Sequence, residues 1–367
     1  MLTANHKTFD LAVVGAGPAG ASSGITAARL GANVVLFEAK SFPRHKVCGE
    51  FVSAESLDVL VELFRDSESG RRLVDSAGVL RRARLFLGGR TIDAPVSPPA
   101  VSITRYDLDA ALWESARLAG VEARSNCEVT SITGDGPFQL TTAAGSYFAR
   151  ALVIAAGRWS QFAADRVVPP GPKWIGVKGH FRESDPSPST DLYFFEEGYC
   201  GVQPVSASTV NACAMVRSDR ATSLPEAFAL HPRLAERSAS WEAGMSPVST
   251  APLIYRQPRP AQGNILYAGD AAAFIDPFVG DGISIALRSG KTAAECLRFL
   301  FSGESALAEC ASRYQREYAR QFAPLLSAAS RVRTLLSLPV VARAAVFELF
   351  RIPGLMPLVI RKTRRVS

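Results

Sequence analysis

Three glycines near the start of the chain have the spacing that binds a pyrophosphate. Gly15, Gly17 and Gly20 stand in the run GAGPAG, between an apolar, strand-like stretch (FDLAVV) and a small-residue stretch typical of a helix. The first glycine permits the tight turn, the second lets the backbone approach the phosphates, and the third lets helix and strand pack closely. The helix N-terminus, at Pro18 and Ala19, adds unpaired N–H donors and a positive dipole end. The loop therefore predicts a dinucleotide site.

A carboxylate follows the glycine loop at the distance expected for a ribose partner. Glu38 and Ala39 end the second strand-like run, NVVLFEA, and we expect both residues to lie against the nucleotide. A carboxylate about twenty residues after such a loop accepts hydrogen bonds from ribose hydroxyls and disfavours a 2′-phosphate. The ligand is then either NAD or the ADP half of FAD.

A second segment, ILYAGDAAAFIDPFVGDGISIAL, favours FAD. A carboxylate follows a strand-like run here, where it suits the hydroxyls of a ribityl chain. The helix start after the Pro/Gly loop offers backbone donors to the anionic edge that a reduced flavin develops. The residues expected to bind the cofactor here are Gly269, Asp270, Pro277, Gly280, Asp281, Gly282 and Ile283.

Together these motifs resemble FAD-dependent oxidoreductases with the glutathione-reductase-type FAD fold. Within that group the chain is most similar to the geranylgeranyl reductase-like family, which is related to aromatic hydroxylases and flavin-dependent halogenases. FPRHKVCGE (Phe42–Glu50) resembles the PRxKxCGG segment of the reductases, and RYDLDAAL (Arg105–Leu112) resembles their R-x-x-L-D-x-x-L helix start. The late helix also carries the SG-x-x-AAE pattern (Ser289–Glu295) of the same family. The likeness covers about the first 300 residues.

Differences from the related families bear on the chemistry. Aromatic hydroxylases carry Asp where this chain has Ala156, before Gly157, and halogenases carry a W-x-W-x-I-P segment that this sequence lacks. Reductases of long isoprenoids have Y-x-W-x-F-P, and here the corresponding run YCGVQP (Tyr199–Pro204) has Gly201 in place of the large aromatic. These differences favour reductase chemistry, on a pocket of changed shape.

Further cofactor contacts follow from position and from the resemblance. Arg44 and Lys46 come after the second strand, where cations meet a pyrophosphate or an anionic flavin, and solvated surface charge is the alternative. Arg105 is expected at the cofactor, with a salt bridge to Asp107 or Asp109 as the alternative. The resemblance also implies that Val129 and Gly157 contact FAD.

Three residues are candidates for the catalytic chemistry. Cys48 is a proton donor or a residue facing the flavin, or else a small buried thiol. Glu50 is a proton relay, or a capping carboxylate for a helix that begins at Ser53. Tyr199 faces a substrate cavity, or is an ordinary sheet aromatic. His45 and His180 lack partners at catalytic or metal-ligand spacing, and no metal site is expected.

The segment pattern predicts an α/β fold. We expect a Rossmann-type FAD domain interleaved with a substrate domain built on an antiparallel sheet, plus a C-terminal helical segment. The expected parts are 1–90 (FAD-binding), 91–165 (FAD-binding, with an antiparallel meander), 166–260 (substrate domain), 261–303 (FAD-binding, with the GD strand and helix) and 304–367 (C-terminal helices).

Composition narrows the setting and the partners. The chain has 47% apolar and 20% charged residues, six scattered cysteines, no signal-peptide pattern and no apolar run long enough to span a bilayer. These features predict a reduced, cytoplasmic protein. The net charge of +7 suits an anionic cofactor, and the basic C-terminal segment predicts contact with a membrane surface or carrier protein, or a lid or dimer contact. No nucleic-acid-binding motif is present, so we expect no such partner.

The predicted activity is hydride transfer between FAD and a carbon–carbon bond of a hydrophobic small molecule, as the resemblance implies. The alternative is a flavin-dependent monooxygenase that hydroxylates an aromatic or polyketide-like substrate through a C4a-hydroperoxide. A halogenase and a non-catalytic flavoprotein are further alternatives. The external electron donor is left open between NAD(P)H and a reduced partner.

Overall fold

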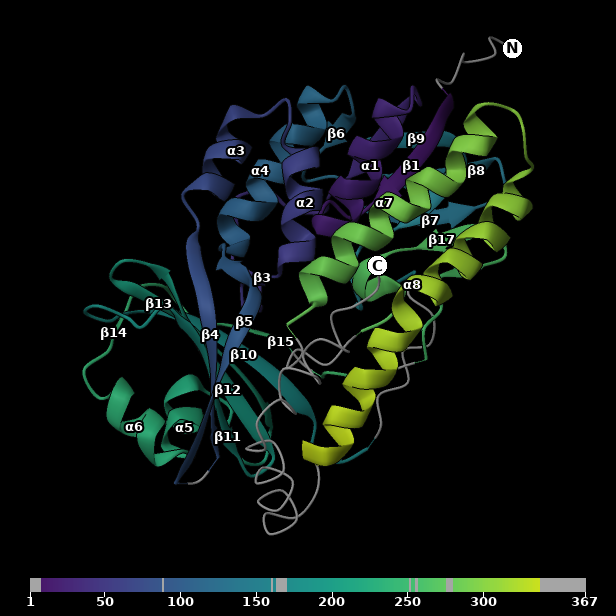
Figure 1. Cartoon of the computed structure of the whole chain (residues 1–367). Helices are drawn as coiled ribbons and strands as arrows, with labels where there is room; N and C mark the ends of the chain where they lie inside the picture. The colour runs from purple at the N-terminus through teal and green to yellow at the C-terminus, as the bar shows by residue number, and fades with distance from the viewer. Residues whose placement is uncertain are drawn as a thin grey trace.

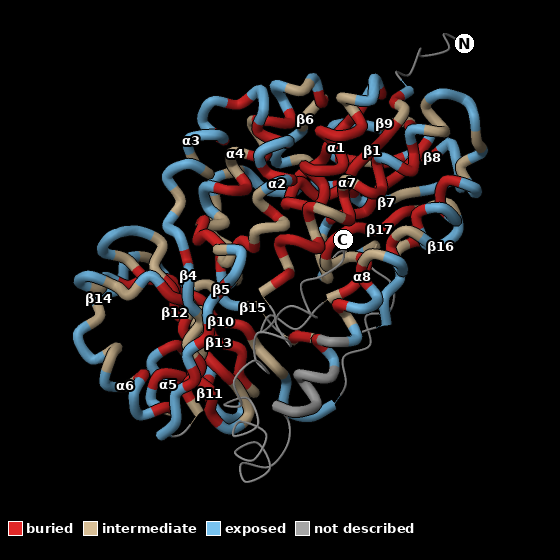
Figure 2. Tube along the Cα trace, viewed as in Figure 1, coloured by how far each residue is buried: buried red, intermediate tan, exposed pale blue. Residues whose placement is uncertain are grey.

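Two β-sheets and the helices packed on them form the described structure (Figure 1). The computed structural model describes residues 8–87, 89–159, 161–162, 170–250, 252–254, 257–274 and 280–336. Buried residues concentrate along the strands of the first sheet and its helices, and again in the second sheet (Figure 2). The predicted α/β class, with a parallel sheet and a separate antiparallel sheet, is confirmed.

The first sheet has a parallel core that carries the glycine loop. Its order is β16 (Ala261–Gln262), β17 (Ile265–Tyr267), β9 (Gly145–Ile154), β1 (Thr8–Val14), β2 (Val34–Phe37) and β6 (Glu122–Arg124). All pairs along this path are parallel except β16 with β17. The central strands are almost wholly apolar because both of their faces are covered.

The predicted meander leads into β9. Strands β7 (Val129–Thr133) and β8 (Phe138–Thr142) pair antiparallel with each other, and β8 pairs antiparallel with the first part of β9. The later residues of β9 then pair parallel with β1. The same strand therefore closes the meander and belongs to the cofactor sheet.

Helices pack beside the glycine loop because small residues let them approach. Helix α1 (Pro18–Arg29) begins at the loop and packs on α7 (Gly282–Phe301) and α4 (Arg105–Leu118). A Cβ at Gly20 would lie 1.7 Å from the Gly15 carbonyl oxygen, and one at Gly290 would lie 2.0 Å from the Ala19 carbonyl oxygen. Helices α2 (Ala54–Leu63) and α3 (Glu68–Asp75) complete this layer.

The second sheet is mainly antiparallel. Its order is β14 (Glu242–Ala243), β10 (Trp174–Arg182), β13 (Thr209–Arg217), β12 (Gly198–Ser206), β11 (Ser189–Phe195), β4 (Gly78–Leu87), β5 (Arg90–Ser102) and β3 (Phe51–Val52), with β15 (Val248–Thr250) beside β10. Only β11 and β4 pair parallel. Helices α5 (Leu224–Ala229) and α6 (Pro232–Ser238) cover one face.

Three strands of this sheet, β3, β4 and β5, come from residues that the sequence-based division assigned to the FAD-binding parts. Strands β4 and β5 pair with each other and join the second sheet through β11. The run GVLRRARLFL hides the strand signal because arginines interrupt its apolar alternation. Arg82 and Arg84 meet the carboxylates of Asp93 and Asp191 in neighbouring strands, which stabilises those charges within the sheet.

The C-terminal helix is confirmed as far as the structure describes it. Helix α8 (Leu307–Leu336) packs on α7, with Tyr314, Tyr318 and Phe322 buried between them. Residues 337–367, which hold most of the predicted basic segment, lie outside the described residues. Within the described ranges, no helix is both long and apolar enough to cross a bilayer.

The Gly290 contact predicts a stability effect. We expect Gly290→Ala to lower the free energy of unfolding by about 2 kcal/mol, because the new methyl group overlaps the Ala19 carbonyl and separates α7 from α1. Urea unfolding measures the change. Gly78→Ala is the matched control, since a Cβ there has no atom within 4 Å. Equal stability of the two variants would contradict this account of the helix contact.

Candidate functional site

The glycine loop lies at the carboxyl end of β1, at the start of α1. Gly15 has φ +99°, and a Cβ there would lie 2.5 Å from the Ala156 Cα. Gly17 is the N-cap of α1, and Pro18 occupies the first turn, where its missing N–H is no loss. A Cβ at Gly17 would lie 3.7 Å from both Arg105 Nη2 and Lys46 Nζ. Two cations therefore converge where the loop offers its N–H groups.

Glu38 is fixed against the same loop. Its side chain is buried, and Oε2 accepts a hydrogen bond from the Ala16 N–H at 3.1 Å. The other oxygen, Oε1, accepts from the Lys40 N–H at 3.1 Å and from Arg44 Nη2 at 2.9 Å. Arg44 therefore pairs with Glu38, and Ala39 is exposed directly beyond it. The carboxylate stands beside the backbone that would meet the phosphates.

Arg105 combines the two roles that the sequence left as alternatives. Its guanidinium makes two hydrogen bonds of 2.7 Å to the buried Asp109 carboxylate, and it also lies beside Gly17. Lys46 Nζ lies 3.8 Å from the same carboxylate. Burial disfavours the charged guanidinium, but Asp109 outweighs this and raises the pKa of Arg105. Asp107 instead accepts a hydrogen bond from Thr104 at the helix start.

The second predicted cofactor segment lies beside the first turn of α1. A Cβ at Gly269 would lie 3.0 Å from the Ala19 Cβ, and the Gly269 N–H donates to Ser289 Oγ at 2.9 Å. Asp270 Oδ2 lies 3.4 Å from Arg158 Nη1. The structure thus brings the GD turn to the glycine loop, although the two are far apart in the sequence.

The remaining predicted cofactor residues lie around this junction or at strand ends. Gly280 has φ +74°, Asp281 is the buried N-cap of α7, and Gly282 and Ile283 form the first turn of that helix. Pro277 lies outside the described residues.

Val129 and Gly157 were predicted from the resemblance alone. Val129 begins β7, and its carbonyl oxygen accepts from Gln161 Nε2 at 3.1 Å. Gly157 follows β9 with φ +76°.

These residues fit a dinucleotide. The glycine loop is a cradle that Cβ atoms would fill, a buried carboxylate is fixed at its edge, and two cations stand over it. The glycine loop, with Lys46 and Arg105, would hold the pyrophosphate. Glu38 would accept from the ribose, and Asp270 with the α7 N-terminus would meet the flavin half.

Glu50 connects this region to the second sheet. Its fully buried carboxylate pairs with Lys178 Nζ through Oε1 and with His180 Nε2 at 2.8 Å through Oε2. Oε1 also accepts from the Arg105 N–H at 2.7 Å, so Glu50 caps α4. The predicted cap on the helix at Ser53 is therefore wrong, because the carboxylate points toward β10 and α4.

The roles of Lys178 and His180 were missed by sequence reasoning. Both residues lie on β10 two positions apart, so they share one face of the sheet. The signal was the run GVKGH, which places two basic side chains at strand spacing among small and apolar residues. Burial would raise the pKa of Glu50, but the hydrogen bond from His180 and the charge of Lys178 outweigh it and lower that pKa.

Cys48 lies beside this cluster. Its Sγ accepts a hydrogen bond from the Glu50 N–H at 3.3 Å, and its carbonyl oxygen accepts from Asn211 Nδ2 at 3.1 Å. Burial raises the pKa of the thiol, so Cys48 keeps its proton at neutral pH. The thiol is therefore suited to hold a proton, and unsuited to act as a resident nucleophile.

Tyr199 stands on the face of the second sheet opposite α5 and α6. Strand alternation decides which side chains this face has, and they form an apolar area at one end of the strands and a polar area at the other. We call one area the apolar half, and its buried residues include Leu85, Ile92, Phe194, Tyr199 and Met215. The polar half consists of Lys178, His180, Gln203 and Asn211.

The apolar half extends to the GD segment. Phe274, which lies within that segment after Asp270, packs against the apolar half, and the Arg158 guanidinium lies 4.3 Å from the centre of its ring. Trp174 and Leu253 adjoin the same cluster. An apolar wall thus adjoins the segment that carries the predicted flavin contacts.

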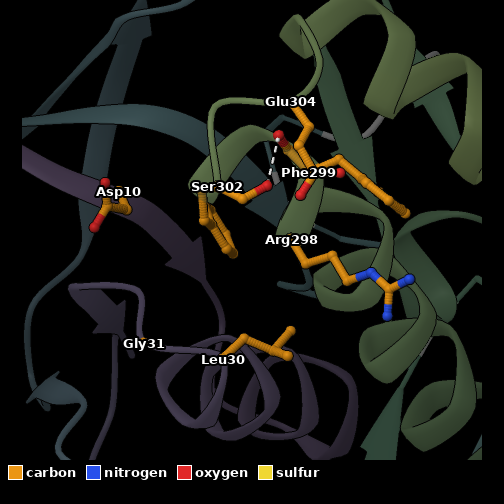
Figure 3. Close-up of a pocket in the computed structure, with 8 residues that line it drawn as sticks. Asp10, Leu30, Gly31, Arg298, Phe299, Ser302 and Glu304 are labelled. Carbon is orange, nitrogen blue, oxygen red and sulfur yellow. Dashed lines mark hydrogen bonds between the residues drawn. The ribbon is translucent and has the colours of Figure 1, made fainter.

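A separate surface pocket of about 370 Å³ lies away from these residues (Figure 3). It is lined by Asp10 of β1, the end of α1 at Leu30 and Gly31, and the end of α7 with the turn after it, including Glu304. Asp10 belongs to the amino-terminal half of β1, whereas the glycine loop follows its carboxyl end. None of the predicted site residues lines this pocket.

Comparison with known proteins defines the class. A family model described as FAD dependent oxidoreductase matches residues 41–296, and the chain belongs to this family. It is an FAD-dependent oxidoreductase, as the two motifs predicted.

Relatives within the class differ in what their names state. The conditioned medium factor receptor 1 of Dictyostelium discoideum is 25% identical over 87% of this chain and 69% of its own length. The menaquinone reductase of Mycolicibacterium smegmatis is 27% identical over 90% and 85%, and a digeranylgeranylglycerophospholipid reductase of Methanopyrus kandleri is 25% identical over 86% and 83%. A flavin-dependent brominase structure aligns with a TM-score of 0.80 at 21% identity, covering 97% of this chain and 93% of the brominase, and shows the shared fold.

Removal of the Glu38 carboxylate tests the ribose role. We expect Glu38→Ala to raise the Kd for FAD about tenfold or more, because the ribose loses an acceptor and the Ala16 N–H loses its partner. Fluorescence of released FAD measures the constant. Glu68→Ala, which removes an exposed carboxylate on α3, is the control. An FAD affinity as tight as that of the control would contradict the assignment.

The Glu50 carboxylate predicts a pH-dependent contribution to stability. Glu50→Gln should lower the free energy of unfolding by about 3 kcal/mol, because Lys178 is left buried without its counter-charge. The native pKa of Glu50 lies below its ordinary value, so the stabilisation is present above the unfolded-state pKa and is lost as pH falls through the native one. The difference between wild type and variant is therefore undiminished from about pH 8 to about pH 5 and shrinks below about pH 4. Denaturant unfolding across this range measures it, and a difference that grows below about pH 4 would contradict the ion pair.

Proposed function

We propose that this FAD-dependent oxidoreductase transfers hydride between the flavin and a carbon–carbon bond of a hydrophobic small molecule bound on the apolar half of the second sheet. The main support for this proposal is the position of the apolar half. Its residues adjoin Phe274, within the segment that carries Gly269 and Asp270, and occupy the same sheet face as the polar half, over which Cys48 lies. A substrate on this wall would lie between the predicted flavin contacts and the Cys48 thiol.

The side chains of the wall suit an apolar substrate. Phe194, Tyr199 and Met215 offer aromatic and thioether surface, and burial of apolar area is the main source of affinity for such ligands. Gly201 stands between Leu192 and Cys213 in the register, and a Cβ there would meet only ordinary van der Waals contacts. The wall therefore has no side chain at Gly201, where the similar reductases have a large aromatic residue.

Bound FAD supplies the hydride, and the chain must supply or admit one proton for each double bond reduced. Cys48 is a protonated thiol beside the polar half, and the Glu50 N–H donates to its sulfur. That N–H would stabilise the thiolate left after proton release.

The names of two relatives support reduction. One is a menaquinone reductase and the other a digeranylgeranylglycerophospholipid reductase, so members of similar sequence include reductases. The electron donor that reduces the flavin in this chain is proposed to be NAD(P)H or a reduced partner protein.

The proposed reaction is tested by anaerobic reoxidation. We expect photoreduced holoprotein, without oxygen, to be reoxidised by an isoprenoid or other hydrophobic alkene at a rate that saturates with alkene concentration. The saturated product should form in equal amount to the flavin oxidised. Stopped-flow absorbance and product mass spectrometry measure the two quantities.

The same holoprotein tests the alternative. If reduced protein and substrate react only with oxygen, and oxygen-18 gas labels the product, the enzyme is a monooxygenase and the hydride proposal fails.

A Cys48→Ala variant tests the proton donor. It should slow the reduction of the alkene by the reduced holoprotein and diminish the solvent deuterium effect on that step. Cys310→Ala is the control thiol variant, since that buried cysteine lies on α8, outside the second sheet.

A further inference from the structure

The backbone at Glu50 is strained for a residue with a side chain. Its φ is 62°, in the left-handed region that residues other than glycine rarely adopt. Such a conformation costs free energy of folding and persists only where the surroundings enforce it. The neighbouring Gly49 would tolerate the left-handed conformation without strain, but the carboxylate-bearing residue adopts it. The strain therefore accompanies the placement of the carboxylate.

The carboxylate contacts two separate parts of the molecule. Lys178 and His180 belong to β10 of the second sheet, while the Arg105 N–H is the first amide of α4, which packs on α1. The Glu50 carbonyl oxygen also accepts from the Ile103 N–H at 3.1 Å, just before α4. Glu50 thus fixes the start of α4 relative to β10.

Residues fixed in this way carry the cations over the glycine loop. Arg105, held by Glu50 through its amide, extends its guanidinium to within contact of the Gly17 position. Lys46 lies four residues before Glu50 in the same segment and reaches the same position. Asn211 of β13 donates to the carbonyl oxygens of Cys48 and Gly49 and holds this segment on the sheet.

Stability alone does not account for the Glu50 cluster, which we define as Glu50, Lys178 and His180. A buried ion pair is weak support for a fold, because desolvation offsets most of the attraction and apolar residues of similar size serve as well. Here the charges are also combined with a strained backbone. The opposite face of the same sheet has its own buried carboxylate, Asp191, paired with Arg84 and Arg237 at ordinary backbone angles.

We propose that Glu50 is a positioning residue for the cofactor: from the second sheet it sets the place of Arg105 and Lys46 at the glycine loop, and so controls the affinity for FAD without touching the loop. The second sheet then contributes to the binding of FAD. The proposal is independent of the reaction, because it concerns retention of the cofactor by reductase and monooxygenase alike.

The test measures FAD affinity and stability separately. The apoproteins of wild type, Glu50→Gln and Asp191→Asn are titrated with FAD by fluorescence quenching, and their melting temperatures are recorded. Both variants remove a buried carboxylate charge from the same sheet, so both should melt earlier. We expect Glu50→Gln to raise the Kd for FAD about tenfold or more, a loss of roughly one charged hydrogen bond, and Asp191→Asn to leave it within about twofold.

A second variant keeps the proposal testable if Glu50→Gln does not fold. Glu50→Gly with Lys178→Met relieves the strained φ and removes both buried charges, so it leaves no unpaired ion. We expect this double variant to melt near the wild type and still bind FAD about tenfold more weakly. An affinity equal to that of the wild type in a folded Glu50 variant, or an equal loss in Asp191→Asn, would overturn the positioning role and leave Glu50 as a structural ion pair.

Discussion

The absence of a side chain at Gly20 is the constraint on which the cofactor sheet depends. With no Cβ, α1 can start directly against the carbonyl of Gly15, and its N-terminal amides lie at the end of β1. Gly290 in the same way lets α7 pack directly against the Ala19 carbonyl of α1. Gly269 lies between these two helices, beside Ala19 and Ala286. The two cofactor segments meet because backbone packs on backbone at both places.

Charge is distributed differently in the two halves of the molecule. Around the glycine loop, buried carboxylates hold cations near the place of an anionic ligand: Glu38 holds Arg44, and Asp109 holds Arg105 and Lys46. These ion pairs keep long side chains ordered, so less conformational entropy is lost when the phosphates bind. On the face of the second sheet opposite α5 and α6, apolar residues cover the area proposed for substrate, and the buried pair of Glu50 and Lys178 lies beneath the Cys48 segment.

Short-range patterns in the sequence were sufficient for much of this arrangement. The glycine loop, the helix start at Arg105 and the helix start after the Pro/Gly loop are local signals, and the structure has each of them. The start of the second sheet was not predicted, since arginines in β4 satisfy their charges on carboxylates of neighbouring strands. Pairing of Glu50 with β10 was also beyond reach, because it joins residues 128 and 130 positions apart. For Arg105 the sequence offered two carboxylates, and helical i, i+4 spacing selected Asp109.

The division of one sheet face into apolar and polar halves has a consequence for how this protein can evolve. Both halves are formed by the same strands. Each of β10, β12 and β13 contributes to the apolar half at one end and to the polar half at the other. Side chains alternate between faces, so a single inserted residue within β10 would turn Lys178 and His180 toward α5 and bury Val177 against Glu50. Substrate range can therefore change by substitution along the apolar end, whereas the length of these strands is fixed in steps of two residues.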